Sequence, residues 1–311
     1  MSRLLLGVFL FSLTRPLAKI FLDLDLPVDL FCLIFLFFRM ISQVPVAAFT
    51  GNLRFRSKSH LLYLLFLGLI GTGLHFTEFK SLTIGLSVPT VSFLIFTHPI
   101  WIQIYRTVIA PTELTYANIL KLVVGVIGTL LIMGPEAIQL PMSWSLFIPL
   151  AASLFFATWV ILSEKIQKEG VPVIQISYYY DVFSFLFLGS IMISSRGLTE
   201  LVDPLLKLTP SVVFSLMAYS VVIGVIANYL FFVGVKKMGS LVASYSLLLE
   251  PILASLIGAI LFEDSSVGFF FFIGSGLIIL INVPESFFKG LTVQVRNLTS
   301  RFAQMLPFSL K

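Results

Sequence analysis

Long apolar runs follow one another through most of the chain, and only short polar links separate them. A helix needs about 20 apolar residues to cross the hydrocarbon core of a bilayer. The sequence therefore predicts an all-α membrane protein with ten transmembrane helices. The predicted spans are residues 3–22, 30–50, 61–80, 84–108, 116–134, 144–165, 172–194, 211–235, 241–262 and 267–284.

Composition excludes other classes of protein. Of the 311 residues, 58% are hydrophobic and 11% are charged, which is too apolar for a soluble fold of this length. The runs do not alternate between apolar and polar residues as the strands of a membrane β-barrel do. Cys32 is the one cysteine, so no disulfide can form within the chain, and the three histidines lack the spacing of a zinc motif. We expect no metal and no cofactor.

The two halves of the chain follow one plan. The link 135–143 separates residues 1–134 from residues 144–284, and each part holds five predicted spans. His98 and Glu250, each followed by a proline, take the same place in the fourth span of their halves. Because five is odd, a duplicated second half enters the membrane in the opposite orientation. The sequence thus predicts two inverted five-helix repeats.

The basic residues indicate the orientation. With a cytoplasmic N-terminus, 14 of the 20 basic residues fall on the cytoplasmic side, 3 on the other side and 3 within spans. This positive-inside bias favours a bacterial inner membrane with both termini in the cytoplasm. Since the basic residues lie in links beside the membrane, the net charge of +5 does not indicate a nucleic-acid partner. No signal-peptide cleavage site follows the first run, so it is expected to be a retained span.

The tail, residues 285–311, has a different pattern. Apolar residues recur at steps of three and four from Phe288 to Met305, and Lys289, Arg296 and Arg301 fall mostly on the other side. This pattern predicts a basic amphipathic helix on the anionic inner leaflet. A regulatory or partner-binding role is the alternative.

Ionisable residues inside the spans mark the expected working site. Such a residue costs about 2.5–3.5 kcal/mol on insertion scales unless it faces the protein interior or a watery cavity. Arg15, followed by Pro16, is expected to face the solute, and Glu250 and Asp181 are the candidates for proton coupling. Arg39 is expected to clamp helices together, with contact to the solute as the alternative.

Polar and aromatic residues complete the predicted site. His75 and Glu78 share one helix face, and Asn228 lies in a row with Ser220 and Gly224. Packing between helices is the alternative interpretation of such rows. The predicted substrate-binding residues are Arg15, His75, Thr97, His98, Trp101, Trp159, Tyr178, Asp181, Asn228, Tyr229, Tyr245 and Glu250.

The second half resembles a known family. The segment Leu247–Glu263, which reads Leu-Leu-Leu-Glu-Pro-Ile-Leu-Ala-Ser-Leu-Ile-Gly-Ala-Ile-Leu-Phe-Glu, is similar to the second repeat of EamA-type proteins of the drug/metabolite transporter superfamily. Residues 227–239 fit the stretch before it, and Arg39 matches a residue often seen in that family. The first half departs from the pattern, because Pro111 stands where the family usually has the glutamate that Glu263 matches.

The resemblance implies ten helices, two inverted repeats and a central site lined by spans one, three, four, six, eight and nine. It does not specify one solute, since members of the family move amino acids, nucleotide sugars, sugar phosphates, drugs and S-adenosylmethionine.

The predicted function is secondary or exchange transport of a small organic solute by alternating access. The sequence contains no G-x-x-x-x-G-K-[ST] motif, so a gradient or a counter-solute, rather than ATP, is expected to drive it. Both signs of charge inside the spans favour an amino acid or an amino-acid-derived zwitterion, with protons as possible coupling ions. S-adenosylmethionine and nucleotide-linked or phosphorylated metabolites are alternatives. A membrane-embedded enzyme or receptor is the alternative of another class, but neither H-E-x-x-H nor a nucleophile–base pair is evident.

Overall fold

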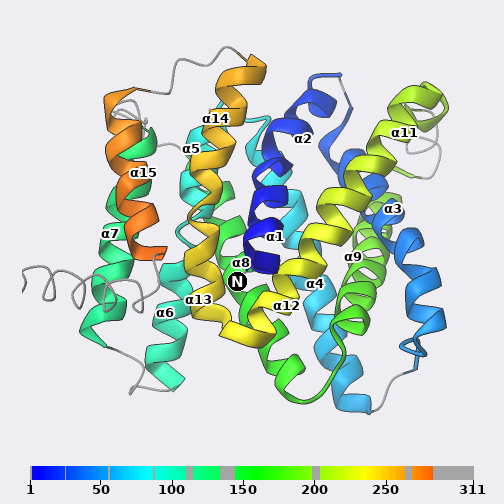
Figure 1. The fold of residues 1–311 in the computed structure, drawn as a ribbon. Helices are drawn as coiled ribbons and strands as arrows, with labels where there is room; N and C mark the ends of the chain where they lie inside the picture. Colours follow the sequence, from blue (N-terminus) through cyan, green and yellow to red (C-terminus); the bar gives the residue numbers. More distant parts are fainter. Residues whose placement is uncertain are drawn as a thin grey trace, which may run out of the picture.

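The chain folds into a bundle of helices that stand side by side (Figure 1). The computed structural model describes residues 2–24, 26–54, 57–86, 88–109, 115–133, 144–197, 204–262 and 268–282. Within these ranges the protein is all-α and contains no strand. The expected link 135–143 and the expected amphipathic tail 285–311 lie outside the described residues, as do Pro111 and Glu263.

Within the described residues, seven segments are long and apolar enough to cross a membrane. Three of these segments consist of more than one helix. They are α1 with α2, α11 with the π-helix η4 and α12, and α13 with α14. Their bounds are α1 Ser2–Ser12, α2 Thr14–Leu22, α3 Val28–Phe49, α4 Lys58–Ser81, α8 Phe147–Lys168, α9 Val173–Arg196, α11 Pro210–Tyr219, η4 Ser220–Ala227, α12 Asn228–Met238, α13 Ser240–Leu247 and α14 Glu250–Phe262. A short 3-10 turn, η3 Trp144–Leu146, precedes α8.

Shorter helices occupy the other three predicted spans. They are α5 Val88–Ile95 with α6 His98–Ile109, then α7 Tyr116–Met133, and α15 Phe269–Asn282. Length and hydropathy therefore identify seven spans rather than ten, and the count of ten stays a prediction.

Three spans break into two helices just before a proline. A proline has no backbone N–H and cannot continue a helix, but it fits the first turn of a new one. Each break therefore begins a second helix with proline as its second or third residue. The breaks lie at Leu13 before Pro16, at residues 96–97 before Pro99, and at residues 248–249 before Pro251.

The break between α5 and α6 replaces the continuous span that the sequence predicts over residues 84–108. Pro99 leaves the carbonyl of Ile95 without its helical N–H partner. His98 occupies this position instead, with Nδ1 at 3.2 Å from the Ile95 oxygen. Because a carbonyl only accepts, Nδ1 is the donor. The histidine side chain thus completes the backbone hydrogen bonding that the proline interrupts.

Glycines permit the closest helix contacts. A Cβ on Gly274 of α15 would lie 2.3 Å from the carbonyl oxygen of Gly128 on α7, so these helices pack backbone to backbone. They form a pair at one side of the bundle (Figure 1). A Cβ on Gly224 of η4 would lie 2.4 Å from Cδ of Arg39. The wide π turn and the missing side chain therefore admit Arg39 of α3 into the interior.

Candidate functional site

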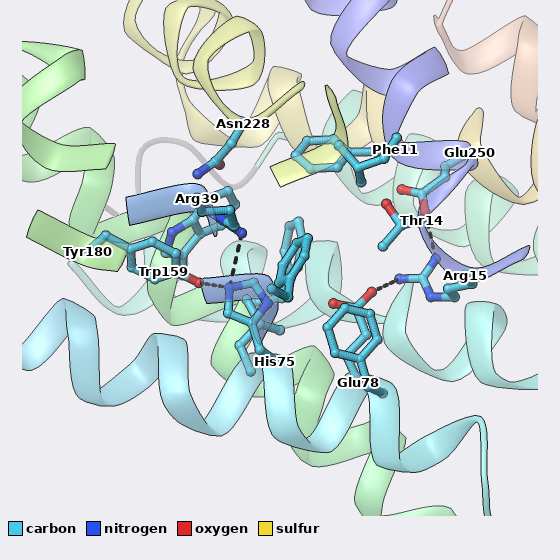
Figure 2. Close-up of a pocket in the computed structure, with 15 residues that line it drawn as sticks. Phe11, Thr14, Arg15, Arg39, His75, Glu78, Trp159, Tyr180, Asn228 and Glu250 are labelled. Atoms are coloured by element: carbon cyan, nitrogen blue, oxygen red, sulfur yellow. Dashed lines mark hydrogen bonds and ion pairs between the residues drawn. The ribbon is translucent and has the colours of Figure 1, made fainter. Parts of the chain in front are cut away.

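A small cavity of about 40 Å³, lined by both charged and aromatic side chains, lies between the helices (Figure 2). Since a water needs about 10–15 Å³ of such volume, the cavity has room for about three waters and not for a metabolite. Its walls come from α1, α2, α3, α4, α8, α9, η4, α12 and α14. The lining residues are Phe11, Thr14, Arg15, Phe35, Arg39, Leu74, His75, Glu78, Phe79, Phe156, Trp159, Tyr180, Ile223, Asn228 and Glu250.

One buried arginine holds two carboxylates. Arg15 Nη2 lies 2.8 Å from Glu78 Oε1, and Arg15 Nη1 lies 2.6 Å from Glu250 Oε1. The guanidinium also lies over the ring of Phe96, 5.0 Å from its centroid. Figure 2 shows Arg15 between the two glutamates, which come from α4 and α14. We call Arg15, Glu78 and Glu250 the Arg15 cluster.

A second buried arginine faces a single carboxylate. Arg39 Nη2 of α3 lies 2.7 Å from Asp181 Oδ1 of α9. Gln43, one turn further along α3, donates through Nε2 to Asp181 Oδ2. Asp181 is fully buried. We call Arg39, Gln43, Asp181, His75 and Tyr180 the Arg39 cluster.

His75 is neutral in this arrangement. Its Nε2 lies 3.3 Å from Arg39 Nη1 and 3.0 Å from the hydroxyl of Tyr180. Arginine can only donate, so Nε2 accepts and carries no proton. The proton must then sit on Nδ1, which is buried and has no partner. Figure 2 shows Arg39, His75 and Tyr180 on the opposite side of the cavity from Arg15.

Several donors on the cavity residues have no partner. Buried polar groups are normally hydrogen-bonded, so unpaired ones indicate places for water or a ligand. Most of these atoms are N–H donors, which suits a ligand with acceptor oxygens. They are Arg15 Nε, Arg39 Nε, His75 Nδ1, Trp159 Nε1 and Asn228 Nδ2, together with the Thr14 hydroxyl.

Two groups of aromatic rings contribute to the cavity wall. In the first aromatic group, near the start of α3, Phe31 packs against Phe79 at 4.9 Å between ring centroids, and Tyr219 packs against Phe35 at 5.3 Å. In the second aromatic group, on α8 and α12, Trp159 packs against Phe232 at 5.0 Å and against Phe156 at 5.1 Å. Each group includes two residues that line the cavity.

A further ionic contact lies beyond the second aromatic group. Arg106 Nη2 of α6 lies 2.6 Å from Glu164 Oε2 of α8 and donates to the hydroxyl of Ser240 at 2.9 Å. The same glutamate oxygen accepts the backbone N–H of Ser240 at the start of α13. This Arg106 contact joins three helix ends beside a hollow of about 420 Å³.

The structure brings together part of the predicted site. Arg15, His75, Trp159, Asn228 and Glu250 line the cavity, and Arg39 does so as well. Asp181 lies behind this wall as the partner of Arg39.

The other predicted residues lie outside the cavity. Thr97 bonds Ser153 at 2.8 Å, and His98 packs behind Phe156 at 4.5 Å between ring centroids. The Tyr245 hydroxyl donates to the Asn118 carbonyl. Trp101 and Tyr229 are 38% and 42% exposed on the outside of the bundle, and Tyr178 is partly buried.

Three polar residues of the cavity, Thr14, Glu78 and Tyr180, were not among the predicted site residues. Glu78 shares a helix face with His75, so its position in the row was the available signal. Tyr180 follows two other tyrosines, and periodicity favoured Tyr178 because that residue is three positions from Asp181. Within the described ranges no group of three histidine, cysteine, aspartate or glutamate side chains could hold a metal ion.

Comparison with known families decides what kind of protein this is. A model of the EamA-like transporter family matches residues 2–134 and, a second time, residues 142–281. The chain belongs to the EamA-like transporter family. Family membership and the apolar helices together identify a multi-pass membrane protein that is a transporter of the drug/metabolite type.

Solved structures share the EamA-like fold. Twenty-eight chains match, and one of them, described only as a crystal structure of a protein, has a TM-score of 0.67 and 16% sequence identity. The match covers 90% of this chain and 95% of that one. At this identity the likeness shows the fold alone. A comparison with curated proteins finds no match.

Proposed function

We propose that this protein moves an amino acid or an amino-acid-derived zwitterion across the bacterial inner membrane by alternating access. The observation that carries the proposal is the interior cavity, in which Arg15 lies between two carboxylates inside a transporter fold. Arg15 would bind the carboxylate of the solute, and Glu78 or Glu250 would bind its amine. The Arg15 cluster thus offers a binding partner for each charged group of a zwitterion.

We propose ten transmembrane helices in two inverted repeats, residues 1–134 and 144–284, with both termini in the cytoplasm. The family model matches once in each half, which supports a duplication. The broken pair α5 and α6, with α7 and α15, would supply the three spans beyond the seven long ones. An odd number of spans in each half then inverts the second repeat.

Transport would require the cavity to widen and open to each side in turn. The two aromatic groups and the Arg106 contact are the barriers that must separate. The breaks before Pro16, Pro99 and Pro251 would allow each of these spans to bend, because turn-type hydrogen bonds between residues three apart interrupt the regular helical ladder there. Arg15 and Glu250 lie in the first turn after such breaks, so bending would move the charged groups themselves.

The charged side chains of the two clusters favour some solutes over others. Arg15 and Arg39 supply two positive charges, whereas Glu78, Asp181 and Glu250 supply three negative ones. Both arginines already face carboxylates, so a nucleotide-linked or phosphorylated solute would add negative charge to a site that has an excess of it. S-adenosylmethionine, which carries a net positive charge, is the second candidate, because this excess and the aromatic wall both favour a cation.

Solute counterflow tests the proposal. Proteoliposomes would be loaded with one unlabelled solute and diluted into the same solute in labelled form. We expect transient accumulation of a neutral amino acid or of S-adenosylmethionine, and none of a sugar phosphate. The matched control is Glu169→Gln, which changes a carboxylate far from the cavity.

Two results would contradict the proposal. The first is label uptake no greater than in protein-free liposomes for every solute in the panel. The second is counterflow that is identical for the wild type and for Arg15→Gln.

A further inference from the structure

We infer that the central site can reorient only when the Arg15 cluster and its contents are neutral, which requires either one proton or one net positive charge of a solute on Glu78 and Glu250. The inference rests on the proposed transport function and specifies its coupling. It predicts that a monocation exchanges for one proton, whereas a net-neutral solute moves without net proton transfer.

The charge count within the Arg15 cluster carries the inference. One guanidinium faces two carboxylates, which leaves one net negative charge. Arg15, Glu78 and Glu250 are 2%, 7% and 4% exposed. An uncompensated charge inside a membrane protein costs free energy, and the same cost applies while the site reorients between the two sides of the membrane. One proton on either glutamate makes the cluster neutral.

Each glutamate has an oxygen available for that proton. Both bond Arg15 through Oε1, and within the described residues neither Oε2 has a hydrogen-bond partner. The two residues line the cavity. A proton or an amine can therefore reach either carboxylate without breaking its bond to Arg15.

Neighbouring groups do not supply the missing charge. Arg39 is neutralised by Asp181, and His75 is neutral because its Nε2 accepts. His98 donates its Nδ1 proton to Ile95, and its Nε2 has no partner. Two remaining titratable groups, on α3 and α11, are themselves donors: the Cys32 thiol points to the carbonyl of His75, and the Tyr219 hydroxyl donates to the carbonyl of Thr14.

Charge neutrality fixes the direction of proton movement. The empty cluster must carry one proton to reorient, and a cluster that holds a net-neutral zwitterion needs the same proton, so no net proton moves with that solute. A cluster that holds a monocation is already neutral, so the proton must leave. Replacing either glutamate by glutamine removes one negative charge, which allows the empty site and the zwitterion-loaded site to reorient without a proton and ends the exchange of a monocation for a proton.

The test compares two driving forces in the same proteoliposomes, with the membrane potential clamped. Labelled neutral amino acids and labelled S-adenosylmethionine serve as the zwitterionic and cationic probes. For wild type with S-adenosylmethionine, one pH unit, acid inside, should drive accumulation of about tenfold, whereas neutral amino acids should not accumulate in response to the gradient. Glu78→Gln and Glu250→Gln should keep counterflow of neutral amino acids and lose the gradient-driven accumulation of S-adenosylmethionine, whereas Glu169→Gln should keep both.

The wild type alone provides a second measurement. A pH-sensitive dye inside the vesicles should report about one proton leaving for each S-adenosylmethionine taken up, and no net proton movement with a neutral amino acid. This readout needs no variant, so a misfolded variant does not remove the test.

The outcomes separate the two proposals. No counterflow in the wild type would overturn the transport function itself. Counterflow of S-adenosylmethionine without a dye response, or without an effect of the pH gradient, would overturn only the coupling, and so would proton entry with a neutral amino acid. Full gradient-driven accumulation of S-adenosylmethionine in both glutamine variants would also overturn it.

Discussion

Both clusters pair a buried arginine with carboxylates, but they differ in the number of carboxylates that face the arginine. Arg39 faces one carboxylate, and Gln43 satisfies the second oxygen of that carboxylate. Arg15 faces two carboxylates, each with an oxygen left without a partner. The Arg39 cluster is therefore balanced in charge, and the Arg15 cluster is not.

The helices that carry the clusters differ in the same way. Arg39 and Asp181 lie within unbroken helices, α3 and α9. Arg15 and Glu250 lie where helices restart after a break. The comparison teaches that the balanced pair holds packed helices together, whereas the unbalanced cluster lies where the bundle can bend and where ligands can supply the missing charge.

The largest expected effect is on stability, in the Arg39 cluster. Arg39→Leu would leave the fully buried carboxylate of Asp181 without its counter-charge, which costs about 3–5 kcal/mol of unfolding free energy. Thermal unfolding in detergent measures the loss. The double variant Arg39→Leu/Asp181→Leu should recover most of it, because a buried pair replaced by apolar groups is often neutral. A double variant as unstable as the single one would contradict a purely structural pair.

Arg15→Leu should reduce solute affinity more than it reduces stability. The variant removes a charge-assisted hydrogen bond to the solute worth about 1.5–3 kcal/mol, which corresponds to roughly ten- to a hundredfold in affinity. The two glutamates line the cavity, so water and protons can relieve their repulsion. Concentration-dependent counterflow measures the affinity, and Lys237→Leu, at an exposed position, is the control. Unchanged affinity in Arg15→Leu would mean that the two clusters do not differ in role.

A smaller effect is expected from a single methyl group beside Arg39. Gly224→Ala places a Cβ 2.4 Å from Arg39 Cδ, and such overpacking costs about 1–3 kcal/mol. Gly258→Ala is the matched substitution on α14 of the other cluster, where the added Cβ meets nothing within 4 Å. It should leave the unfolding temperature unchanged or raise it slightly. An equal loss of stability in both variants would show that helix backbone effects, rather than overpacking against Arg39, cause the loss.

The smallest effect concerns the hydroxyl of Tyr180. Tyr180→Phe removes one hydrogen bond to His75 Nε2, worth about 0.5–1.5 kcal/mol. His75 keeps its bond to Arg39, so its neutral form should persist. We expect a modest fall in unfolding temperature with counterflow intact. Loss of counterflow would place Tyr180 in solute binding and weaken the contrast between the clusters.

The charged residues of the cavity were the easiest to predict from the sequence, because charged side chains are rare inside membrane spans. Arg15, Arg39 and Glu250 stood out because charges inside apolar spans demand a reason. Their partners could not be predicted, since Arg15 meets Glu250 across 235 positions of the chain and one sequence holds no record of that pairing. Glu78 was visible in a polar row, but only the fold shows that it shares Arg15.

Aromatic residues were the least predictable part of the site. The chain has 32 phenylalanines and 9 tyrosines, and nothing local separates Phe35 or Tyr180 at the cavity from rings that pack against lipid. Trp101 and Tyr229 are examples of the latter, because both are exposed on the outside. The prolines gave a clearer signal. Pro99 predicted a freed carbonyl, and the structure shows that α5 ends and α6 begins around a turn at residues 96–97.

The tight pairing of α7 and α15 has a practical consequence. Neither helix contributes a described residue to the cavity wall, and the contact of Gly128 with Gly274 leaves them little freedom to slide. Spin labels or fluorophores on this pair would therefore supply a stationary frame of reference. Against it, distances to labels on α2, α6 and α14 would record which side of the membrane the protein opens to, and in what order.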